Sequence, residues 1–310
     1  MALKVSFSDF QRSLSSLSMR PESLAQYVEW DDDSIDQKLV FRSDVFLDEV
    51  PDTFDLNEAV YRYLRELDDR KDVEFEALAF KSKPRVVAEG DSWFNLPFFF
   101  RPFAIADWMK ENKRLRVKNI ARWGHTLSQI LEQDEYIQAI EAYKPQYFMI
   151  GGGGNDIKNS LAKGELFYAY SSDRDVNDYL TPQGVELINY VGDGIEKIIS
   201  KVNSNYPELP IFTHGYDYPR PWVGRGKYIG RYLRDLKIPN EMWDELMHVK
   251  IDLLNSRIEA AASKIANVTY IDCRNLTEPH NWYDDLHPSA SGFHALSLRF
   301  ESEMGVVVDA

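Results

Sequence analysis

The chain has 310 residues, of which 36 are Lys or Arg and 50 are Asp or Glu, so its formal net charge is −14. Hydrophobic residues make up 44% and aromatic residues 13%, which excludes disorder along the whole chain and suits one large domain or two smaller ones. The acidic excess argues against a general nucleic-acid binder, because phosphate contacts need a basic face. We therefore expect no nucleic-acid partner.

The cysteine count and the hydropathy of the sequence indicate in which cellular compartment the protein would be found. Cys273 is the only cysteine, which excludes an intramolecular disulfide and a cysteine metal cluster and favours a reducing compartment. The amino terminus lacks the continuous apolar run of a signal peptide, and no stretch reaches the roughly 18 apolar residues that a membrane span needs. We expect a soluble, cytoplasmic protein.

Residues 1–82 are predicted to form an acidic N-terminal extension. Residues 1–80 hold 19 acidic and 9 basic residues, which leaves 31 and 27 for the rest of the chain. Apolar residues from Leu56 to Leu67 recur at the spacing of an amphipathic helix. No motif is present here, so a structured extension and a segment that binds a protein partner both remain open.

From Pro84 onwards short apolar strands alternate with longer helical patterns. This alternation predicts an α/β domain over residues 83–310, with a mostly parallel sheet covered on both faces. Ligands of such sheets bind beyond the carboxyl ends of the strands. The predicted strands are Arg85–Glu89, Arg116–Ile120, Gln146–Ile150, Leu209–Thr213 and Val268–Asp272, and the predicted helices are Ala104–Glu111, Leu127–Ala142, Gly184–Asn203, Glu241–Ala266 and Ser291–Glu303.

Two stretches of this domain carry patterns of their own. In Glu241–Ala266, apolar residues that include Leu246, Val249 and Leu253 fall at helical spacing and predict a helix that faces the core. Trp222–Leu236 interleaves basic and aromatic residues. It is either a solvated insertion over the site or a surface that meets an anionic substrate or lipid headgroups.

Polar motifs follow several predicted strands. Gly90-Asp91-Ser92 comes directly after the first strand, where Ser92 is either a reactive hydroxyl or a helix N-cap. The nucleophile elbow of the alpha/beta-hydrolases does not fit, because Phe94 stands where that motif needs a glycine.

A run of four glycines, Gly151 to Gly154, follows the third predicted strand and precedes Asn155. Such a run predicts an irregular turn that lets the backbone approach a ligand closely. No Gly-Lys-Ser or Gly-Lys-Thr follows, so the run does not match a phosphate-binding loop. The remaining functional interpretation is an oxyanion site. Near the carboxyl end, the acid and histidine of Asp284-Asp285-Leu286-His287 lie three residues apart after the fifth strand.

Taken together, these motifs resemble the SGNH (GDSL-type) hydrolase family, whose blocks read Gly-Asp-Ser, Gly, Gly-x-Asn-Asp and Asp-x-x-His. The resemblance covers residues 84–304 and implies a flavodoxin-like three-layer sandwich with serine-hydrolase chemistry. The blocks stand here, in order, as Gly90-Asp91-Ser92, Gly124, Gly153-Gly154-Asn155-Asp156 and Asp284-Asp285-Leu286-His287.

The resemblance also implies roles by position. Ser92 would be the nucleophile, His287 its general base and Asp284 the residue that orients the imidazole. A serine hydroxyl needs such a base at neutral pH, and the base needs a carboxylate to fix its tautomer. Asp285 is a rival for the orienting role. The backbone N–H groups of Ser92 and Gly124 and the side-chain amide of Asn155 would form the oxyanion hole.

Other residues near these blocks are weaker candidates. Trp93, Phe98 and His214 are predicted to contact substrate, although a buried loop start for the first two and a structural role for His214 also fit. Asp91 and Asp156 are expected to anchor loops by hydrogen bonds. His248, His280 and His294 show no metal-ligand grouping.

The function predicted from the sequence is that of a serine esterase or lipase without metal or cofactor. It would cleave an ester of a lipid, a small molecule or an acylated glycan through an acyl-enzyme, so a lipid or membrane surface is among the expected partners. Acyl transfer to another acceptor and a non-catalytic module that binds a partner through residues 1–82 remain open.

Overall fold

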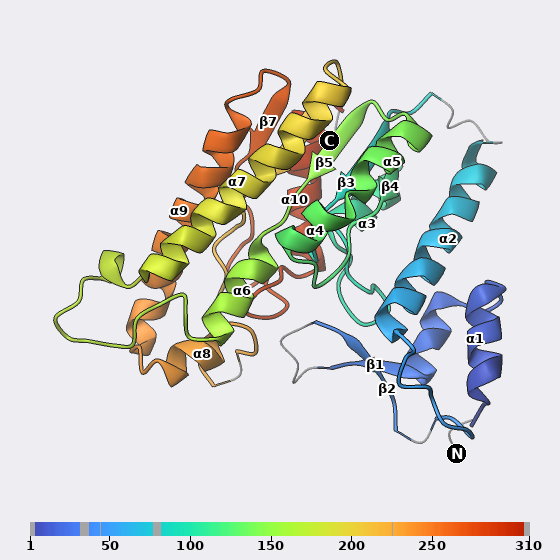
Figure 1. The fold of residues 1–310 in the computed structure, drawn as a ribbon, viewed down its shortest axis with the longest axis horizontal. Helices are drawn as coiled ribbons and strands as arrows, with labels where there is room; N and C mark the ends of the chain where they lie inside the picture. The colour runs from blue at the N-terminus through green and yellow to red at the C-terminus, as the bar shows by residue number, and fades with distance from the viewer. Residues whose placement is uncertain (1–3, 32–36, 44, 77–81, 225, 307–310) are drawn as a thin grey trace. The chain divides into compact units, whose positions relative to one another are not determined.

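The computed structural model describes residues 4–31, 37–43, 45–76, 82–224 and 226–306 (Figure 1). The chain divides into two compact units. Unit 1 comprises Met1–Lys83 and Pro97–Arg101, and unit 2 comprises Pro84–Leu96 and Pro102–Ala310. The division between 83 and 84 lies one residue from the junction predicted from the sequence. The membership of residues 97–101 in unit 1 was not predicted.

Unit 1 has an aromatic core. The Phe7 ring meets Phe54 edge-on, with ring centroids 4.9 Å apart, and the Arg101 guanidinium lies 4.6 Å from the centroid of the Trp30 ring. The helix predicted over Leu56–Leu67 is present and continues to residue 76. The elements of the unit are α1 (Phe7–Ser15), the 3-10 helix η1 (Pro21–Gln26), the antiparallel strands β1 (Val28–Trp30) and β2 (Leu39–Phe41), and α2 (Leu56–Glu76).

Unit 2 is built on a five-stranded, all-parallel sheet in the order β4-β3-β5-β6-β7. Strand β3 lies between β4 and β5, and its Val86 pairs with Val117 on one side and Tyr147 on the other. This architecture confirms the predicted α/β class and all five predicted strands to within two residues. The strands are β3 (Arg85–Glu89), β4 (Arg116–Asn119), β5 (Tyr147–Ile150), β6 (Ile211–His214) and β7 (Val268–Ile271).

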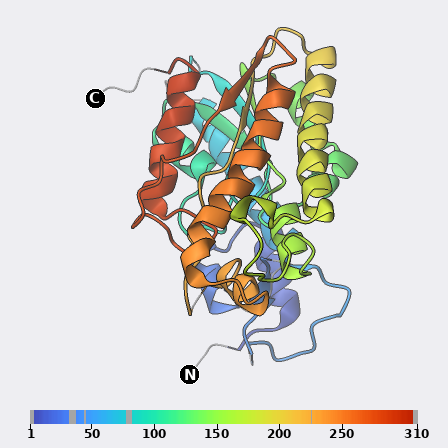
Figure 2. The ribbon, with the colours of Figure 1, turned by 90° about the vertical axis from the view of Figure 1, so that its left-hand side faces the viewer.

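Helices cover both faces of this sheet, as buried parallel strands require. Helices α3 (Ile105–Glu111) and α10 (Ala290–Glu303) pack together on one face. On the other face α7 (Pro182–Asn205) and α9 (Trp243–Ala262) run side by side (Figures 1 and 2). The remaining helices are α4 (Leu127–Gln133), α5 (Glu135–Tyr143), α6 (Gly154–Ala162), α8 (Gly230–Asp235), and the 3-10 helices η2 (Val176–Asp178) and η3 (Asn240–Met242).

Two sequence predictions about helices were wrong. The single helix predicted over Leu127–Ala142 is two helices, because Asp134 between them adopts the left-handed conformation with φ 54°. The glycine run is irregular only as far as Gly153, which caps α6 at φ 99°, and Gly154 already begins that helix. Asn155 therefore lies in the first turn of a helix and not in a loop.

None of the helices in the described part of the chain combines the length and the apolar character that crossing a membrane requires.

Candidate active site

Ser92 stands in a tight turn that leaves strand β3. The turn runs close to the loop after β5, since a Cβ on Gly90 would come 2.8 Å from the carbonyl oxygen of Gly151. Asp91 fixes the turn. Its carboxylate accepts a hydrogen bond from the backbone N–H of Trp93 at 3.0 Å and another from the Tyr216 hydroxyl at 2.7 Å. The expected anchoring role of Asp91 is thus confirmed.

A chain of hydrogen bonds joins Ser92, His287 and Asp284. The Oγ of Ser92 lies 2.9 Å from Nε2 of His287, and Nδ1 of the same ring lies 3.0 Å from both carboxylate oxygens of Asp284. All three side chains are buried. The side chains that the sequence singled out from the two ends of the domain therefore meet at one edge of the sheet.

The carboxylate of Asp284 also holds the loop that carries His287. The backbone N–H groups of Leu286 and His287 donate to Oδ1 of Asp284 at 2.9 and 2.7 Å. Burial alone would raise the pKa of the Asp284 carboxyl, but the charge and hydrogen bond of His287, together with these two donors, outweigh it and lower the pKa. Asp284 is therefore ionised at neutral pH.

Asp285, the rival for the orienting role, points elsewhere. Its buried carboxylate accepts hydrogen bonds from the backbone N–H groups of four consecutive residues, 227 to 230, at 2.7 to 3.2 Å. This cradle fixes the segment before α8, and the ring of Tyr228 from that segment packs edge-on against His287 with centroids 5.6 Å apart. In this structure the carboxylate hydrogen-bonded to the imidazole is that of Asp284, and Asp285 holds a neighbouring segment in place.

Gly124 and Asn155, the other two residues predicted for an oxyanion hole, follow two other strands. Gly124, after β4, adopts φ 79°, a conformation that favours glycine. Asn155 is buried, and its side-chain amide donates one hydrogen bond to the carbonyl of His125 at 2.8 Å. An amide nitrogen has two hydrogens, so one is left for a ligand. Asp156 accepts from the backbone N–H of Leu127 at 2.8 Å, which confirms its expected anchoring role.

This geometry agrees with the family comparison. The model of the GDSL-like lipase/acylhydrolase family matches residues 88–295. The chain belongs to this family. No curated protein matches its sequence closely enough to add a relative.

Several solved structures are similar to this GDSL-like chain in fold. An alpha/beta hydrolase from the metagenome of Lake Arreo, Spain, is 12% identical over 74% of this chain and 99% of its own, with a TM-score of 0.47. An acetylxylan esterase from Geobacillus stearothermophilus is 14% identical over 75% of this chain and 100% of its own, with a TM-score of 0.44. A lipase/acylhydrolase from Enterococcus faecalis is 21% identical over 71% and 95%, with a TM-score of 0.41.

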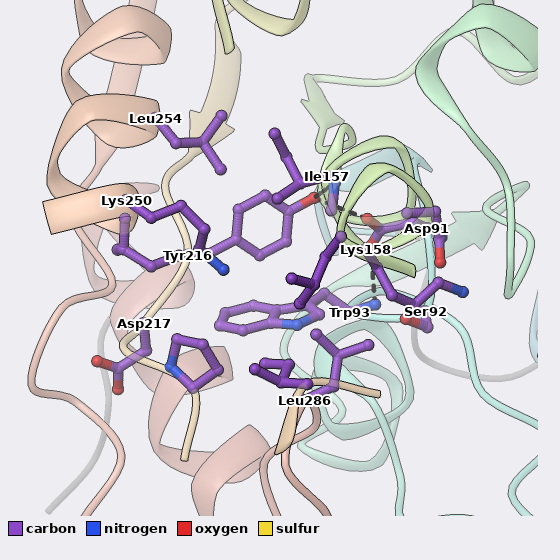
Figure 3. Close-up of a pocket in the computed structure, with 16 residues that line it drawn as sticks. Asp91, Ser92, Trp93, Ile157, Lys158, Tyr216, Asp217, Lys250, Leu254 and Leu286 are labelled. Atoms are coloured by element: carbon purple, nitrogen blue, oxygen red, sulfur yellow. Dashed lines mark hydrogen bonds between the residues drawn. The ribbon is translucent and has the colours of Figure 1, made fainter. Parts of the chain in front are cut away.

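A cavity opens beside Ser92 in this GDSL-like domain. Trp93, one of the predicted substrate contacts, lines it together with side chains from α6, α9 and the loop after β6 (Figure 3). Most of its wall is apolar, which suits the hydrocarbon part of a ligand. The lining residues used below are Asp91, Ser92, Trp93, Lys158, Tyr216, Asp217, Ile229 and Lys250.

The other two predicted substrate contacts are not in this wall. His214 belongs to the core: it is 1% exposed, stacks on Trp93 at 5.8 Å and donates from Nδ1 to the carbonyl of Gly215. Its ring thus supports a lining residue from behind, and the structural alternative was right. Phe98 falls within Pro97–Arg101, which cluster with unit 1, so it is not part of the unit that forms this cavity.

Two buried lysines in the wall were missed by the sequence reasoning. Lys158 on α6 is 3% exposed and Lys250 on α9 is 5% exposed. A signal for Lys250 was present, because it lies three and four residues from Met247, Leu246 and Leu254, in a buried helical stripe that is apolar apart from Asn255. A charged residue at a core position of an amphipathic helix calls for a functional explanation.

The basic aromatic stretch Trp222–Leu236 contributes to the same cavity. Ile229 lines the wall, and Tyr228, Ile229 and Leu233 are buried. The stretch is therefore partly core and not simply a solvated insertion. Arg225 lies outside the described residues.

Proposed function

We propose that the chain hydrolyses carboxylic esters through an acyl-enzyme on Ser92. The observation that carries this proposal is the continuous hydrogen-bonded series from the Ser92 hydroxyl through both nitrogens of His287 to Asp284, with distances of 2.9 and 3.0 Å. These distances suit proton transfer without rearrangement. Family membership supports ester chemistry, and the roles of the individual residues are inferred from their geometry.

In the first step, Ser92 Oγ attacks the ester carbonyl and His287 Nε2 takes its proton. Asp284 holds the Nδ1–H tautomer and stabilises the imidazolium that forms. Its lowered pKa keeps this carboxylate charged when the cation appears. The carbonyl π electrons move to the oxygen, which becomes a tetrahedral oxyanion.

The backbone N–H groups of Ser92 and Gly124 and the free hydrogen of the Asn155 amide are the proposed donors to this oxyanion. Within the described residues, neither backbone N–H donates to another group of the chain. The Asn155 amide is fixed by its bond to His125, so the donor is preorganised and loses little entropy when the charge develops.

The intermediate then collapses and the C–O bond to the alcohol breaks. His287 returns its proton to the leaving oxygen, and an acyl-Ser92 ester remains. A water molecule, deprotonated by the same imidazole, attacks the acyl carbon and releases the carboxylic acid and the Ser92 hydroxyl.

Labelling with a fluorophosphonate and hydrolysis of short-chain and long-chain esters test this proposal. We expect wild-type protein to be labelled and active, and Ser92→Ala to lose both properties with an unchanged melting temperature. Ser204→Ala, an exposed serine near the end of α7, is the matched control and should keep both. A wild-type protein that is neither labelled nor active on any ester would overturn the proposal and favour a non-catalytic module.

A further inference from the structure

The side chain of Lys250 extends from the buried face of α9 into the cavity beside Ser92. It is 5% exposed, yet its ammonium makes no hydrogen bond or ion pair with any residue that the structure describes. Figure 3 shows its nitrogen directed into the group of lining side chains.

Such an ammonium is costly to bury. Removal from water disfavours the charged form, and burial lowers the pKa of Lys250 to about 8. The group still carries its proton at neutral pH. Burying a charge without a partner is rare in proteins unless a ligand supplies the partner.

A second lysine lines the same cavity. Lys158 on α6 is 3% exposed, and its Nζ lies 5.9 Å from the centroid of the Tyr228 ring. Two cations thus face a wall that is otherwise mostly apolar. An anion bound in this cavity would give the Lys250 ammonium a charge-assisted hydrogen bond.

The acids in the wall do not pair with Lys250. Asp91 is engaged by Trp93 and Tyr216, as described above. The Asp217 carboxylate accepts from the backbone N–H groups of Asn275 at 2.7 Å and Thr277 at 2.8 Å. Figure 3 shows that carboxylate turned away from the nitrogen of Lys250.

The layout of the cavity indicates which part of an ester it would hold. Ser92 lies at one end and Lys250 at the other, with Trp93 and Lys158 between them (Figure 3). His287, which must protonate the leaving alcohol, is not among the described residues that line the cavity. The alcohol would therefore leave on the side of His287, and the acyl chain would extend from Ser92 towards Lys250.

We propose that this cavity selects acyl groups that end in a carboxylate, with Lys250 as its main counter-ion and Lys158 as the second. The substrates would be half-esters of dicarboxylic acids, in which the apolar methylene chain lies along Trp93 and the far carboxylate reaches Lys250. This inference rests on the proposed function, because it takes acylation of Ser92 as the reaction.

The test compares substrates that differ only in the terminal charge. Monoethyl esters of dicarboxylic acids from malonate to adipate are paired with ethyl esters of unbranched acids of equal chain length, and ethanol release gives kcat/KM for each. We expect wild-type protein to prefer one half-ester over its neutral partner by at least about 10-fold, as a charge-assisted hydrogen bond supplies. If the neutral ester were preferred over the half-ester at every chain length, the inference would be overturned.

Variants locate the origin of the preference. Lys250→Met replaces the ammonium by an apolar group of similar length and should reduce the ratio of charged to neutral kcat/KM by about 10- to 100-fold. Lys158→Met should reduce it in the same direction. Lys264→Met removes the same charge from an exposed lysine that pairs with Glu196 and should leave the ratio unchanged. A ratio retained in Lys250→Met, or lost equally in Lys264→Met, contradicts the assignment.

A binding measurement separates this inference from the proposed function. Ser92→Ala cannot be acylated, and calorimetry with it should detect the preferred half-ester and a weakening of about 10- to 100-fold when Lys250→Met is added. If no ester is hydrolysed but this binding pattern holds, the acyl-enzyme proposal fails and the carboxylate site stands. If neutral esters are hydrolysed but Ser92→Ala binds no half-ester, the carboxylate site fails alone.

Discussion

The amide of Asn155 uses one of its two hydrogens to hold the carbonyl of His125 and leaves the other for the proposed oxyanion. The same bond that orients the donor therefore also ties the first turn of α6 to the loop after β4. A residue of this kind affects the reaction more than the stability of the fold, because only the second hydrogen meets a developing charge.

Asn155→Ala should lower kcat by about 100- to 1000-fold, since one oxyanion donor is lost. The fold should survive, because a single hydrogen bond contributes only about 1 kcal/mol to the free energy of unfolding. Steady-state kinetics and thermal unfolding provide the measurements. Asn159→Ala, one turn later on α6, is the control and should change kcat by less than about 3-fold, within the range of neutral substitutions. Equal losses in both variants would remove Asn155 from the oxyanion hole.

The residues of the proposed triad were predictable from one sequence because each lies in a short ordered block at a strand end. Lys250 was not predicted, although its helix was. The predicted apolar stripe held Leu246 and Leu254, which are buried, but not Lys250, which lies between them on the same face. A pattern built only from apolar residues passes over a lysine in the core.

At the scale of the elements, the position of segment 227–230 depends on the carboxylate of Asp285. Asp285 collects four backbone N–H donors, and burial raises its pKa despite three of these hydrogen bonds, with the neighbouring charge of Asp284 adding to the rise. The adjacent acids thus have separate tasks: Asp284 acts on the imidazole, and Asp285 positions the segment whose Tyr228 packs on it.

Substitution by asparagine should separate these tasks. Asp284→Asn should reduce kcat by about 1000- to 10,000-fold through the wrong imidazole tautomer, with little change in melting temperature. Asp285→Asn turns an amide N–H towards backbone donors, so it should lower the free energy of unfolding by about 1 to 3 kcal/mol and affect kcat less. Urea unfolding gives the free energy of unfolding of both variants, and steady-state kinetics gives their kcat. The reverse pattern would make Asp285 the orienting acid.

Gly226→Ala is an independent probe of this cradle. A Cβ at this position would lie 2.6 Å from Oδ2 of Asp285 and 2.8 Å from the carbonyl oxygen of Trp222, so the segment must shift. We expect a lower melting temperature and a lower kcat in the same direction as in Asp285→Asn. An unaffected enzyme would show that the position of the segment does not matter to catalysis.

Element types were easier to predict than element limits. Strands β3, β5 and β6 carry mostly buried apolar residues, so their identity follows from composition. The break at Asp134, by contrast, depends on one residue in a left-handed conformation that no periodicity marks. Likewise, α6 starts inside a glycine run that reads as a turn. The assignment of Pro97–Arg101 to unit 1 depends on contacts between residues far apart in the chain, which local patterns do not contain.

At the scale of the whole molecule, an unpaired buried lysine lowers the stability of the fold. Burial lowers the pKa of Lys250 to about 8 from 10.5, the value expected in the unfolded chain. Below pH 8 the group is charged in both states and its penalty is fully present. Between pH 8 and 10.5 the folded state releases the proton while the unfolded state keeps it, so the penalty shrinks as the pH rises.

Lys250→Met should therefore be more stable than the wild type at pH 7, by on the order of 2 to 3 kcal/mol, and this advantage should decline between pH 8 and 10.5. Chemical denaturation across this range gives the difference in the free energy of unfolding between the two proteins. Contributions from cavity groups that both proteins share cancel in this difference; these groups include Asp91, Lys158, Tyr216 and Asp217. Lys264→Met, at an exposed ion pair, should stay within about 1 kcal/mol of the wild type. A destabilised Lys250→Met would mean that the ammonium has a structural partner.

The path of the chain through the two units has a consequence for biosynthesis. Unit 1 takes in residues 97–101, yet β3 and Ser92 precede this segment and belong to unit 2. During translation, residues 97–101 emerge from the ribosome only after β3. The N-terminal unit therefore folds completely only when β3 is already exposed, and β3 is then still unpaired, because its partner strands follow later in the chain. For the same reason a chain beginning at residue 84 would retain Phe98, Phe99 and Phe100 without the unit that packs them, and would tend to aggregate.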